Sequence, residues 1–472
     1  MKKTKHGLII FIGLISILLL SCKLEKKEKV IDLPQIRERG ELIAITSYSP
    51  LSYFVYRGEV MGYEYELLQL YSEFTDIPVK IKLARDFGEM INMLERGEGD
   101  LIAYGLTVTS ERRERLTFTD PFNTTRQMLV QRKPEGWRQM LLHRIEQTLV
   151  RNPIDLAGDT IYVRRGSAYV TRLRNLSDEI GSPIHFVEAE EGITTEELIA
   201  MVADGIIDYT VSDENIANIQ SAYYRDLDVS TALSLPQQTA WAVRPSSQKL
   251  LTSLNEWLEE ARRDVDYYVI YNKYFENRRA FRTRYSSAYF PITGGSISPY
   301  DDLFIAAAER LGWDWRLLAA LAFQESRFDP HAQSWAGALG LMQLMPRTAR
   351  EFGANDPFNP MQNIMAGVNF LEWLENYWSG HIEDEQERIY FILASYNAGQ
   401  GHVQDARRLA EAHGVNPDVW HGHVEKYMLK KSNPEFYNHE VVRFGYASGI
   451  EPVNYVRNIF SAHQHYSLFV PQ

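Results

Sequence analysis

The sequence predicts a two-part chain, in which an α/β part is followed by a mainly α-helical part. Three observations support this prediction. Short apolar runs alternate with amphipathic stretches between about residues 41 and 245. The segment 285–299, YSSAYFPITGGSISP, is rich in Ser, Gly and Pro, and the stretch after it has helical periodicity with no convincing strand pattern.

Composition and charge exclude several classes of protein. The 472 residues are 45% hydrophobic and 24% charged, with a mean hydropathy of −0.31, which is typical of a globular protein and excludes a disordered or multi-span membrane protein. The formal net charge is −12, and we therefore expect no nucleic-acid partner. The chain has a single cysteine, so no internal disulfide can form.

The first 22 residues are predicted to be a lipoprotein signal peptide. Three lysines precede the uncharged, mostly apolar stretch 7–20, whose length suits a secretory signal and falls short of the ~20 residues of a membrane-spanning helix. The stretch ends in Leu-Leu-Ser-Cys, which resembles a bacterial lipobox and makes Cys22 the expected lipidation site. An ordinary signal peptide with a free cysteine nearby, or an uncleaved anchor, is the alternative.

Residues 23–34 are charged and are expected to form a tether. Lys23 stands where a signal for retention in the inner membrane would have aspartate, so the resemblance favours sorting to the outer membrane. We therefore expect the rest of the chain to work at the periplasmic face of the cell envelope.

The α/β part is expected to span residues 35–284. Its clearest strand is 79–83, where Val79, Ile81 and Leu83 alternate with two lysines. Further strands are expected at 41–46, 101–104, 160–163, 184–187 and 207–211, and helices at 62–74, 90–94, 168–176 and 195–203. This alternation predicts parallel-sheet α/β units.

Four motifs of this part resemble the extracellular solute-binding proteins of family 3. They are GYEYEL at 62–67, GLTVTSER at 105–112, FTDPF at 118–122 and VSD at 211–213. The resemblance covers about half the chain and implies the periplasmic-binding-protein fold, in which two α/β lobes close around a ligand at a hinge. The two segments that cross between the lobes are expected near 123–131 and 237–244.

The resemblance also implies a regulatory ligand site between the lobes. The Arg112 guanidinium matches a ligand carboxylate, Thr107 and the turn of Gly166 and Ser167 add a hydroxyl and backbone amides, and Asp213 balances an ammonium group. Without the family pattern, Arg112 fits equally well on a solvated helix face, because its neighbours are charged.

One departure from this family bears on the ligand. Amino-acid binders usually have an acidic residue near the end of the first strand, where this chain has Ser47-Tyr48-Ser49, followed by Tyr53, Phe54 and Tyr56. We expect an aromatic mouth that admits a muropeptide or another amino-acid-containing ligand. Binding of this ligand is expected to regulate the second part of the chain.

After the 285–299 linker, residues 300–472 contain three short motifs in a fixed order. Glu325-Ser326, GLMQLMP at 340–346 and SYNAG at 395–399 resemble the goose-lysozyme-like catalytic domain of soluble-type lytic transglycosylases. The resemblance implies a lysozyme-like helical fold that acts on peptidoglycan glycan strands. Ser395 stands where this family usually has alanine.

The residue pattern around Glu325 independently suits a catalytic acid. Asp314 is a plausible N-cap, and Glu325 continues an apolar i, i+3, i+4 series formed by Leu318, Leu321 and Ala322. Burial and the negative end of the helix dipole both raise the pKa of a carboxyl group, as a general acid requires. From the pattern alone, a glutamate that reaches past the apolar face to solvent is the alternative.

The resemblance implies that Glu325 protonates the bond between N-acetylmuramic acid and N-acetylglucosamine. It then deprotonates the sugar's own C6 hydroxyl, which closes a 1,6-anhydro ring without water; the substrate acetamido group can stabilise the developing cation. Substrate-binding roles are implied for Ser326, Met342, Gln343, Tyr396, Asn397 and Tyr455. Both exolytic and endolytic cleavage fit this pattern.

Two other readings stay open at this point. Asp329 would serve a true hydrolase as its second carboxylate, although we expect it to be a loop residue beside Pro330. The chain would otherwise be a periplasmic solute receptor or sensor whose C-terminal domain binds glycan without catalysis. We expect no cofactor and no metal, because the H-x-H pair of His421 and His423 lacks a third clear ligand.

Overall fold

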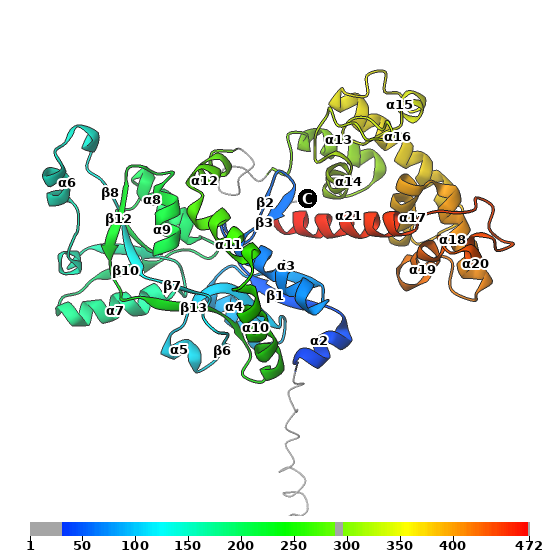
Figure 1. Ribbon diagram of the computed structural model, residues 1–472. Coiled ribbons are helices and arrows are strands. Elements are labelled where there is room, and N and C mark those ends of the chain that lie inside the picture. The colour runs from blue at the N-terminus through cyan, green and yellow to red at the C-terminus, as the bar shows by residue number, and fades with distance from the viewer. Residues whose placement is uncertain (1–30, 288–295, 471–472) are drawn as a thin grey trace, which may run out of the picture.

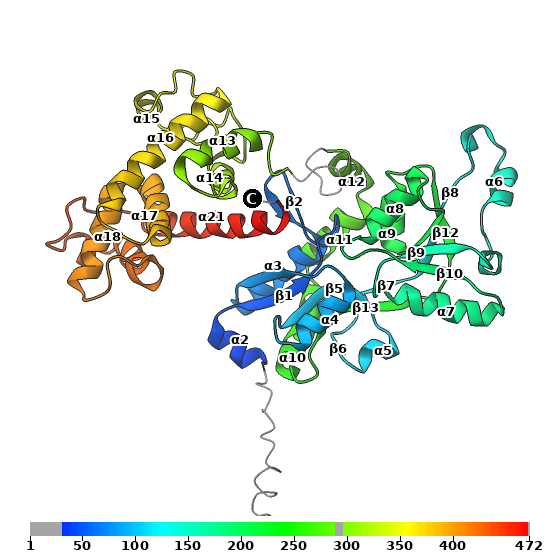
Figure 2. The same ribbon diagram turned by 180° about the vertical axis from the view of Figure 1, so that it is seen from behind.

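The computed structural model describes residues 31–287 and 296–470. Cys22, the predicted signal peptide, most of the predicted tether and the centre of the predicted linker lie outside these ranges. In the part of the chain that the structure describes, no helix is both long and apolar enough to span a membrane. An α/β part and a helical part lie side by side (Figures 1 and 2), which confirms the two-part architecture.

The first lobe contains a mixed sheet in the order β4-β1-β5-β13-β6, with β7 also paired to β13. Strand β1 lies between β4 and β5 and is parallel to both, with Ala44 opposite Ile81. Helices on both faces bury this sheet. The elements are α2 (Leu33–Arg39), β1 (Leu42–Thr46), β2 (Phe54–Tyr56), β3 (Glu59–Met61), α3 (Tyr63–Thr75), β4 (Val79–Leu83), α4 (Phe87–Glu95), β5 (Leu101–Thr107), α5 (Ser110–Arg113), β6 (Thr117–Phe118), β7 (Asn123–Thr125), β13 (Gln237–Val243), α10 (Gln248–Ala261), α11 (Val265–Tyr271) and α12 (Arg278–Tyr285).

The second lobe contains five strands in the order β10-β9-β11-β8-β12. Strand β9 is parallel to β10 and β11, whereas β8 is antiparallel to β11 and β12. Its elements are β8 (Gln127–Arg132), α6 (Leu142–Thr148), β9 (Thr160–Val163), α7 (Ala168–Ile180), β10 (His185–Glu188), α8 (Thr195–Asp204), β11 (Tyr209–Asp213), α9 (Glu214–Ser221) and β12 (Leu227–Ala232).

Two connections join the lobes. The first passes from β7 to β8 within the predicted crossing at 123–131, and the second occupies 233–236, just before the predicted 237–244. The predicted parallel units are present around β1 and β9, and both sheets also contain antiparallel strands that the alternation did not predict. Strands β8 and β13 enter their sheets through these crossings instead of through a helical crossover, and they therefore run antiparallel to their neighbours.

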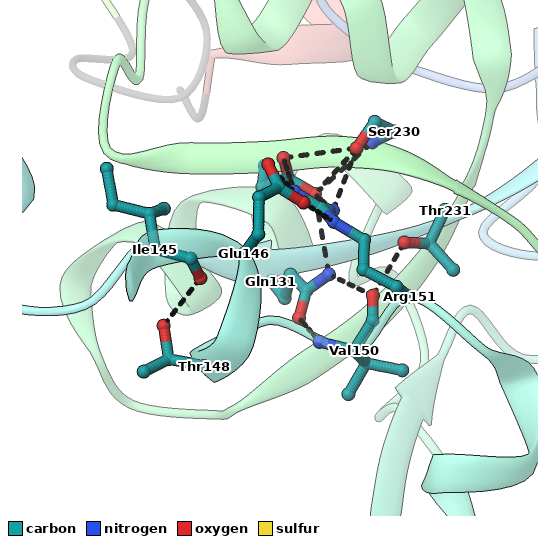
Figure 3. A network of polar contacts seen from close by, with 9 residues as sticks. Gln131, Ile145, Glu146, Thr148, Val150, Arg151, Ser230 and Thr231 are labelled. Atoms are coloured by element: carbon teal, nitrogen blue, oxygen red, sulfur yellow. Dashed lines mark hydrogen bonds and ion pairs between the residues drawn. The ribbon is translucent and has the colours of Figure 1, made fainter. Parts of the chain in front are cut away.

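An excursion between β8 and β9 carries α6 to the far edge of the second lobe (Figure 1). Figure 3 shows the polar network at its base. The Gln131 side chain donates to the Val150 carbonyl at 2.9 Å and accepts from the Val150 amide at 2.9 Å, and Arg151 forms ion pairs with Glu146 and Asp228. These bonds satisfy the backbone of the returning segment and fix the excursion to the sheet.

Residues 296–470 form helices and, within that described range, no strand beyond isolated bridges. The core of this part is built mainly from α14, α16, α17 and α21. The helices are α13 (Asp301–Leu311), α14 (Trp315–Ser326), α15 (Pro346–Glu351), α16 (Pro360–Ser379), α17 (Glu385–Ala398), α18 (Gln400–Ala412), α19 (Glu425–Lys430), α20 (Pro434–Tyr437) and α21 (Ile450–Phe469).

The long helix α21 links the two parts of the molecule. It packs against α14 and α17, and its C-terminal end lies beside the β2–β3 hairpin of the first lobe in both views (Figures 1 and 2). Val55 of this hairpin is buried in the same apolar core as Tyr466 of α21. The two parts therefore share a packed interface at the hairpin.

Candidate active site

Glu325 lies in the last turn of α14, as predicted. The Asp314 side chain caps the helix by accepting from the Arg316 amide at 2.9 Å, and Leu318, Leu321 and Ala322 are fully buried. The helix ends where Arg327 and Phe328 adopt positive φ values of 54° and 62°. This sharp end turns Phe328 back into the core and leaves the half-buried Glu325 beside the loops that follow.

Two tyrosines from other helices approach the Glu325 carboxyl group. The Tyr455 hydroxyl on α21 donates a hydrogen bond to Glu325 Oε1. Burial raises the Glu325 pKa to about 7, although the Tyr455 bond favours the ionised form. The negative charge of Glu325 also helps to keep Tyr396 of α17 protonated, since burial and this carboxylate both raise the Tyr396 pKa. The carboxyl group can therefore hold a proton near neutral pH.

The 340–346 motif forms a tight loop next to this group. Leu339 bridges to Gln333 and to Leu344, Gly340 has a φ of 75°, and Gln343 has a φ of 47°. A Cβ atom on Gly340 would lie 2.2 Å from the Pro357 carbonyl oxygen, so glycine is required at that position by space as well as by backbone conformation.

Three residues predicted to bind substrate are engaged within the protein. The Ser326 hydroxyl lies 2.8 Å from the Leu341 carbonyl oxygen, and the Gln343 amide nitrogen donates to the carbonyls of Ala332 and Gly340. Met342 is fully buried, which contradicts a direct role in the wall of an open groove. In this structure these side chains fix the loop that surrounds Glu325.

Tyr396 and Asn397 lie in the last turn of α17. The Tyr396 hydroxyl donates to the Met342 carbonyl oxygen at 2.7 Å, whereas Asn397 is exposed. Ser395 accepts a hydrogen bond from the buried Trp378 indole at 2.9 Å. The serine that departs from the family pattern therefore satisfies a polar group in the core.

The other carboxylate and the histidine pair lie in different surroundings. Asp329 is exposed and accepts from the His331 amide at 2.9 Å, in the manner of a turn residue. His421 lies 3.4 Å from Glu425, and His423 faces the Asn416 carbonyl. Among the residues described, no cluster of three His, Cys, Asp or Glu side chains is placed to hold a metal ion.

The predicted regulatory residues meet between the two lobes. Arg112 donates to the Thr107 carbonyl at 3.0 Å in the first lobe and to the Gly166 carbonyl at 3.2 Å in the second. Burial lowers the Arg112 pKa, an effect opposed by the charge of Asp213. The guanidinium therefore bridges the lobes directly in this structure.

Asp213 and Ser167 retain unused polar atoms in this cleft. Burial raises the Asp213 pKa to about 7, although Tyr169 and Arg112 favour its ionised form. Asp213 Oδ1 and the Ser167 hydroxyl are buried without a hydrogen-bond partner among the described residues. The cavity beside Asp213 is only about 40 Å³, roughly the space of one water molecule, whereas a separate cavity of about 260 Å³ is lined by Arg112, Gly166 and Ser167.

Comparison with known families covers both parts of the chain. The model of the bacterial extracellular solute-binding proteins, family 3, matches residues 42–277, and the model of the transglycosylase SLT domain matches residues 302–418. "Membrane-bound lytic murein transglycosylase F" of Desulfosudis oleivorans is 34% identical over 90% of this chain and 90% of its own length. The chain belongs to the membrane-bound lytic murein transglycosylase F family.

A second member of the transglycosylase F family, from Alcanivorax borkumensis, is 31% identical over 99% of this chain and 96% of its own length. Among solved structures, a crystal structure of a mutant of ArgBP from T. maritima aligns with 52% of this chain and 99% of that chain, with 26% identity and a TM-score of 0.43.

Two residues that support the candidate sites of this transglycosylase F family member were not predicted from the sequence. Asn363 of α16 is fully buried, accepts from the Met342 amide at 2.7 Å and donates to the Leu339 and Pro357 carbonyls. It thereby holds the loop beside Glu325. The sequence signal that could have identified it is a polar asparagine in the mostly apolar stretch 363–371, where a buried polar group needs hydrogen-bond partners.

In the cleft, Arg164 of the second lobe reaches into the first lobe. It donates to the Ser47 hydroxyl at 2.6 Å and to the Tyr104 hydroxyl at 3.0 Å. Glu64 and Glu196 are also buried there, and burial raises the pKa of both carboxyl groups, that of Glu64 to about 7. Arg164 lies two residues before Gly166 and Ser167, which were predicted to contact the ligand, and this proximity in the sequence could have identified it.

The expected aromatic mouth is wrong. Tyr53 is fully buried and contacts α21, with its hydroxyl bonded to His465 Nδ1 and its ring 5.0 Å from that of Phe469. Phe54 is fully buried in the first-lobe core. Tyr53 therefore belongs to the packing between the two parts of the chain, and Phe54 belongs to the core of the first lobe.

Proposed function

We propose that this protein is a peptidoglycan lytic transglycosylase whose N-terminal part is a solute-binding regulatory module, with domains at the boundaries predicted from the sequence. The observation that supports it best is the half-buried Glu325 carboxyl group, with a pKa raised to about 7, held by Tyr455 beside the 340–346 loop. Family membership supports the same activity.

In the reaction, protonated Glu325 donates its proton to the glycosidic oxygen between N-acetylmuramic acid and N-acetylglucosamine. The resulting carboxylate then takes the proton of the C6 hydroxyl while O6 bonds to C1, which closes the 1,6-anhydro ring and restores the acid. Asn397 is exposed and is the best placed of the predicted residues to contact substrate directly. Ser326, Met342, Gln343 and Tyr396 act through the loop that they position.

Digestion of purified peptidoglycan, with the products weighed, tests this function. Wild type should release anhydro ends, lighter by one water than hydrolytic ends, and Glu325→Gln should release none. Asp329→Asn is the matched control and should keep the anhydro product. Reducing ends that depend on Asp329 would favour a hydrolase, and no Glu325-dependent product would favour a receptor that only binds glycan.

We also propose that ligand binding between the lobes controls the enzyme. Closure around a muropeptide or another amino-acid-containing ligand changes access to Glu325, with Arg112, Thr107, Gly166, Ser167 and Asp213 as the contacts. The unused Asp213 oxygen and Ser167 hydroxyl support this assignment. The shared interface of the β2–β3 hairpin with α21 offers the route to the catalytic part.

The lytic rate with and without added muropeptides tests this control. Wild type should change its rate and its melting temperature, and Asp213→Asn should respond less, because the ammonium partner is lost. Asp208→Asn, an exposed second-lobe aspartate, should respond like wild type. An unchanged wild-type rate together with an unchanged melting temperature would contradict the proposal.

Finally, we propose that Cys22 is lipidated and tethers the mature chain to the outer membrane, facing the periplasm. Labelled palmitate should be incorporated by wild type and not by Cys22→Ala. Membrane fractionation should place wild type in the outer membrane, and Lys23→Asp should shift it toward the inner membrane. Labelling that persists in Cys22→Ala would overturn the anchor.

A further inference from the structure

One line of side chains runs along α16 from the catalytic loop toward the C-terminal end of the helix. In its first half, Asn363 bonds the Met342 amide, and Gly367 leaves room for the Met342 side chain. A Cβ atom on Gly367 would lie 2.7 Å from Met342 Cε. This half of the line supports the loop beside Glu325.

The second half of the line consists of aromatic rings. Phe370 and Trp373 lie 6.0 Å apart with their planes at 20°, Trp373 and Tyr377 lie 6.3 Å apart at 21°, and Tyr377 and His381 lie 5.0 Å apart at 25°. We refer to these four residues as the α16 strip. The spacing of three and four residues places Phe370, Trp373 and Tyr377 on one face of α16, and these three extend about 10 Å along the axis. His381 continues the line just beyond the end of the helix.

The strip begins at the candidate active site. The Phe370 ring lies 5.2 Å from that of Tyr396, whose hydroxyl is bonded to the Met342 carbonyl. Tyr396 is also close enough to Glu325 for the carboxylate charge to raise its pKa. The aromatic line is therefore continuous with the residues that surround the catalytic acid.

The strip is accessible to solvent. Trp373 is 42% exposed, and the other three rings are partly exposed. Trp378 on the same helix is fully buried and bonded to Ser395, and its ring lies 5.2 Å from that of Tyr377 and 5.8 Å from that of His381, so the outer line rests on a buried aromatic residue. Flat rings left in water are a surface that favours association with an apolar face.

Charge near the strip narrows the ligand class. Glu372 pairs with Arg310 at 2.8 Å, and Glu375 pairs with Arg388 at 2.6 Å. Both glutamates of this stretch of α16 are therefore paired with arginines of the protein, and these ion pairs leave little net charge beside the rings. A strongly charged polymer gains little on such a surface, whereas sugar rings present apolar C–H faces to aromatic planes and hydroxyls to polar neighbours.

We propose that the α16 strip is an accessory subsite on which sugars of the glycan strand stack away from the bond that Glu325 cleaves. The inference rests on the proposed lytic function and adds to it a preference for long strands. Only a strand that fills the catalytic groove and extends past Tyr396 gains the stacking contacts. Such contacts strengthen binding of the strand without touching the reacting atoms.

The test measures KM and kcat of full-length Trp373→Ala on long, peptide-free glycan strands and on fragments too short to extend beyond the catalytic groove. We expect KM to rise about tenfold on long strands with kcat unchanged, and neither value to change on short fragments. Trp373→Phe should restore most of the long-strand affinity. Trp137→Ala, a partly exposed tryptophan in the second lobe, is the matched control and should behave like wild type.

The outcomes separate this inference from the proposed function. The accessory subsite would be overturned if Trp373→Ala and wild type had an equal KM on long strands. It would also be overturned if the KM of Trp373→Ala rose equally on long strands and short fragments. Failure of wild type to form anhydro ends on either substrate would instead overturn the lytic function. Binding of Glu325→Gln to insoluble peptidoglycan, with and without Trp373→Ala, measures the strip without catalysis, and unchanged binding would contradict it.

Discussion

The Tyr466 hydroxyl of α21 donates a hydrogen bond to the Gly58 carbonyl oxygen at the tip of the β2–β3 hairpin, at a distance of 2.7 Å. About three turns earlier, the same helix presents Tyr455 to Glu325. One helix therefore contacts the binding module at one end and the catalytic acid at the other. A change in how the hairpin sits on α21 has a direct structural route to the active site.

Gly58→Ala should separate the two parts of the chain. The glycine has a φ of 78°, and a Cβ atom there would lie 2.5 Å from Phe328 and 2.7 Å from Phe323. We expect the melting temperature of the helical part to fall by several degrees in a calorimetric scan. Gly136→Ala is the control, because its φ is 71° and no atom lies within 4 Å. Equal effects of the two variants would show that backbone strain alone is responsible.

Acid should weaken the same interface through His465. Burial lowers the His465 pKa to about 4, below its ordinary value of 6.5, so separated or unfolded chains take up the proton first. The stability due to neutral His465 is present above pH 6.5 and is lost as the pH falls toward 4, on the order of 3 kcal/mol. Thermal unfolding between pH 7 and 4.5 should show a smaller loss in His465→Gln. The exposed control His143→Gln should keep the wild-type loss, and identical slopes for all three would refute this account.

Tyr455→Phe should shift the pH dependence of catalysis. Wild type needs protonated Glu325, so its rate should fall as the pH rises through about 7. The Tyr455 hydrogen bond favours the carboxylate, and its removal should raise the Glu325 pKa and move this decline to higher pH. The rate of anhydro-product release against pH measures the shift. Tyr446→Phe, at an exposed residue, should leave the profile unchanged, and a decline that moves to lower pH would contradict the assignment.

Asn363→Ala should damage the catalytic loop. It removes three hydrogen bonds, including one to the Met342 amide, from a buried site, and we expect a loss of about 3 kcal/mol in the free energy of unfolding. Lytic activity should fall at least tenfold even at temperatures where the variant is folded. Asn369 lies on the same helix as Asn363, and its bonds go to Phe352 and Arg310, outside this loop. Asn369→Ala should therefore stay near wild-type activity. Comparable losses in both variants would remove the special role of Asn363.

Much of the architecture follows from local sequence patterns. The strand at 160–163 and the helix that carries Glu325 were predicted because period-two and period-3.6 patterns are local properties of the chain. The antiparallel placement of β8 and β13 was not predicted, because strand direction depends on where the chain enters a sheet. That entry is decided by contacts between residues 78 to 142 positions apart.

The candidate site divides in the same way. Glu325 and Tyr455 were identified from motifs, and the structure places them in hydrogen-bond contact. The sequence did not predict that Met342 is buried, or that Tyr53 lies at the interface with α21 and not at the mouth of a ligand site. Both depend on which distant helix covers a residue, and no local pattern specifies that.

The hydrogen bond between Ser395 and Trp378 has a consequence for how this protein can diverge. Alanine at 395, the usual residue of the family motif, would leave the indole N–H buried without an acceptor, at a cost of about 1–3 kcal/mol. Position 395 can therefore adopt alanine at low cost only after position 378 has lost its N–H donor. The order of the two substitutions is constrained, and the pair is expected to be inherited as a unit.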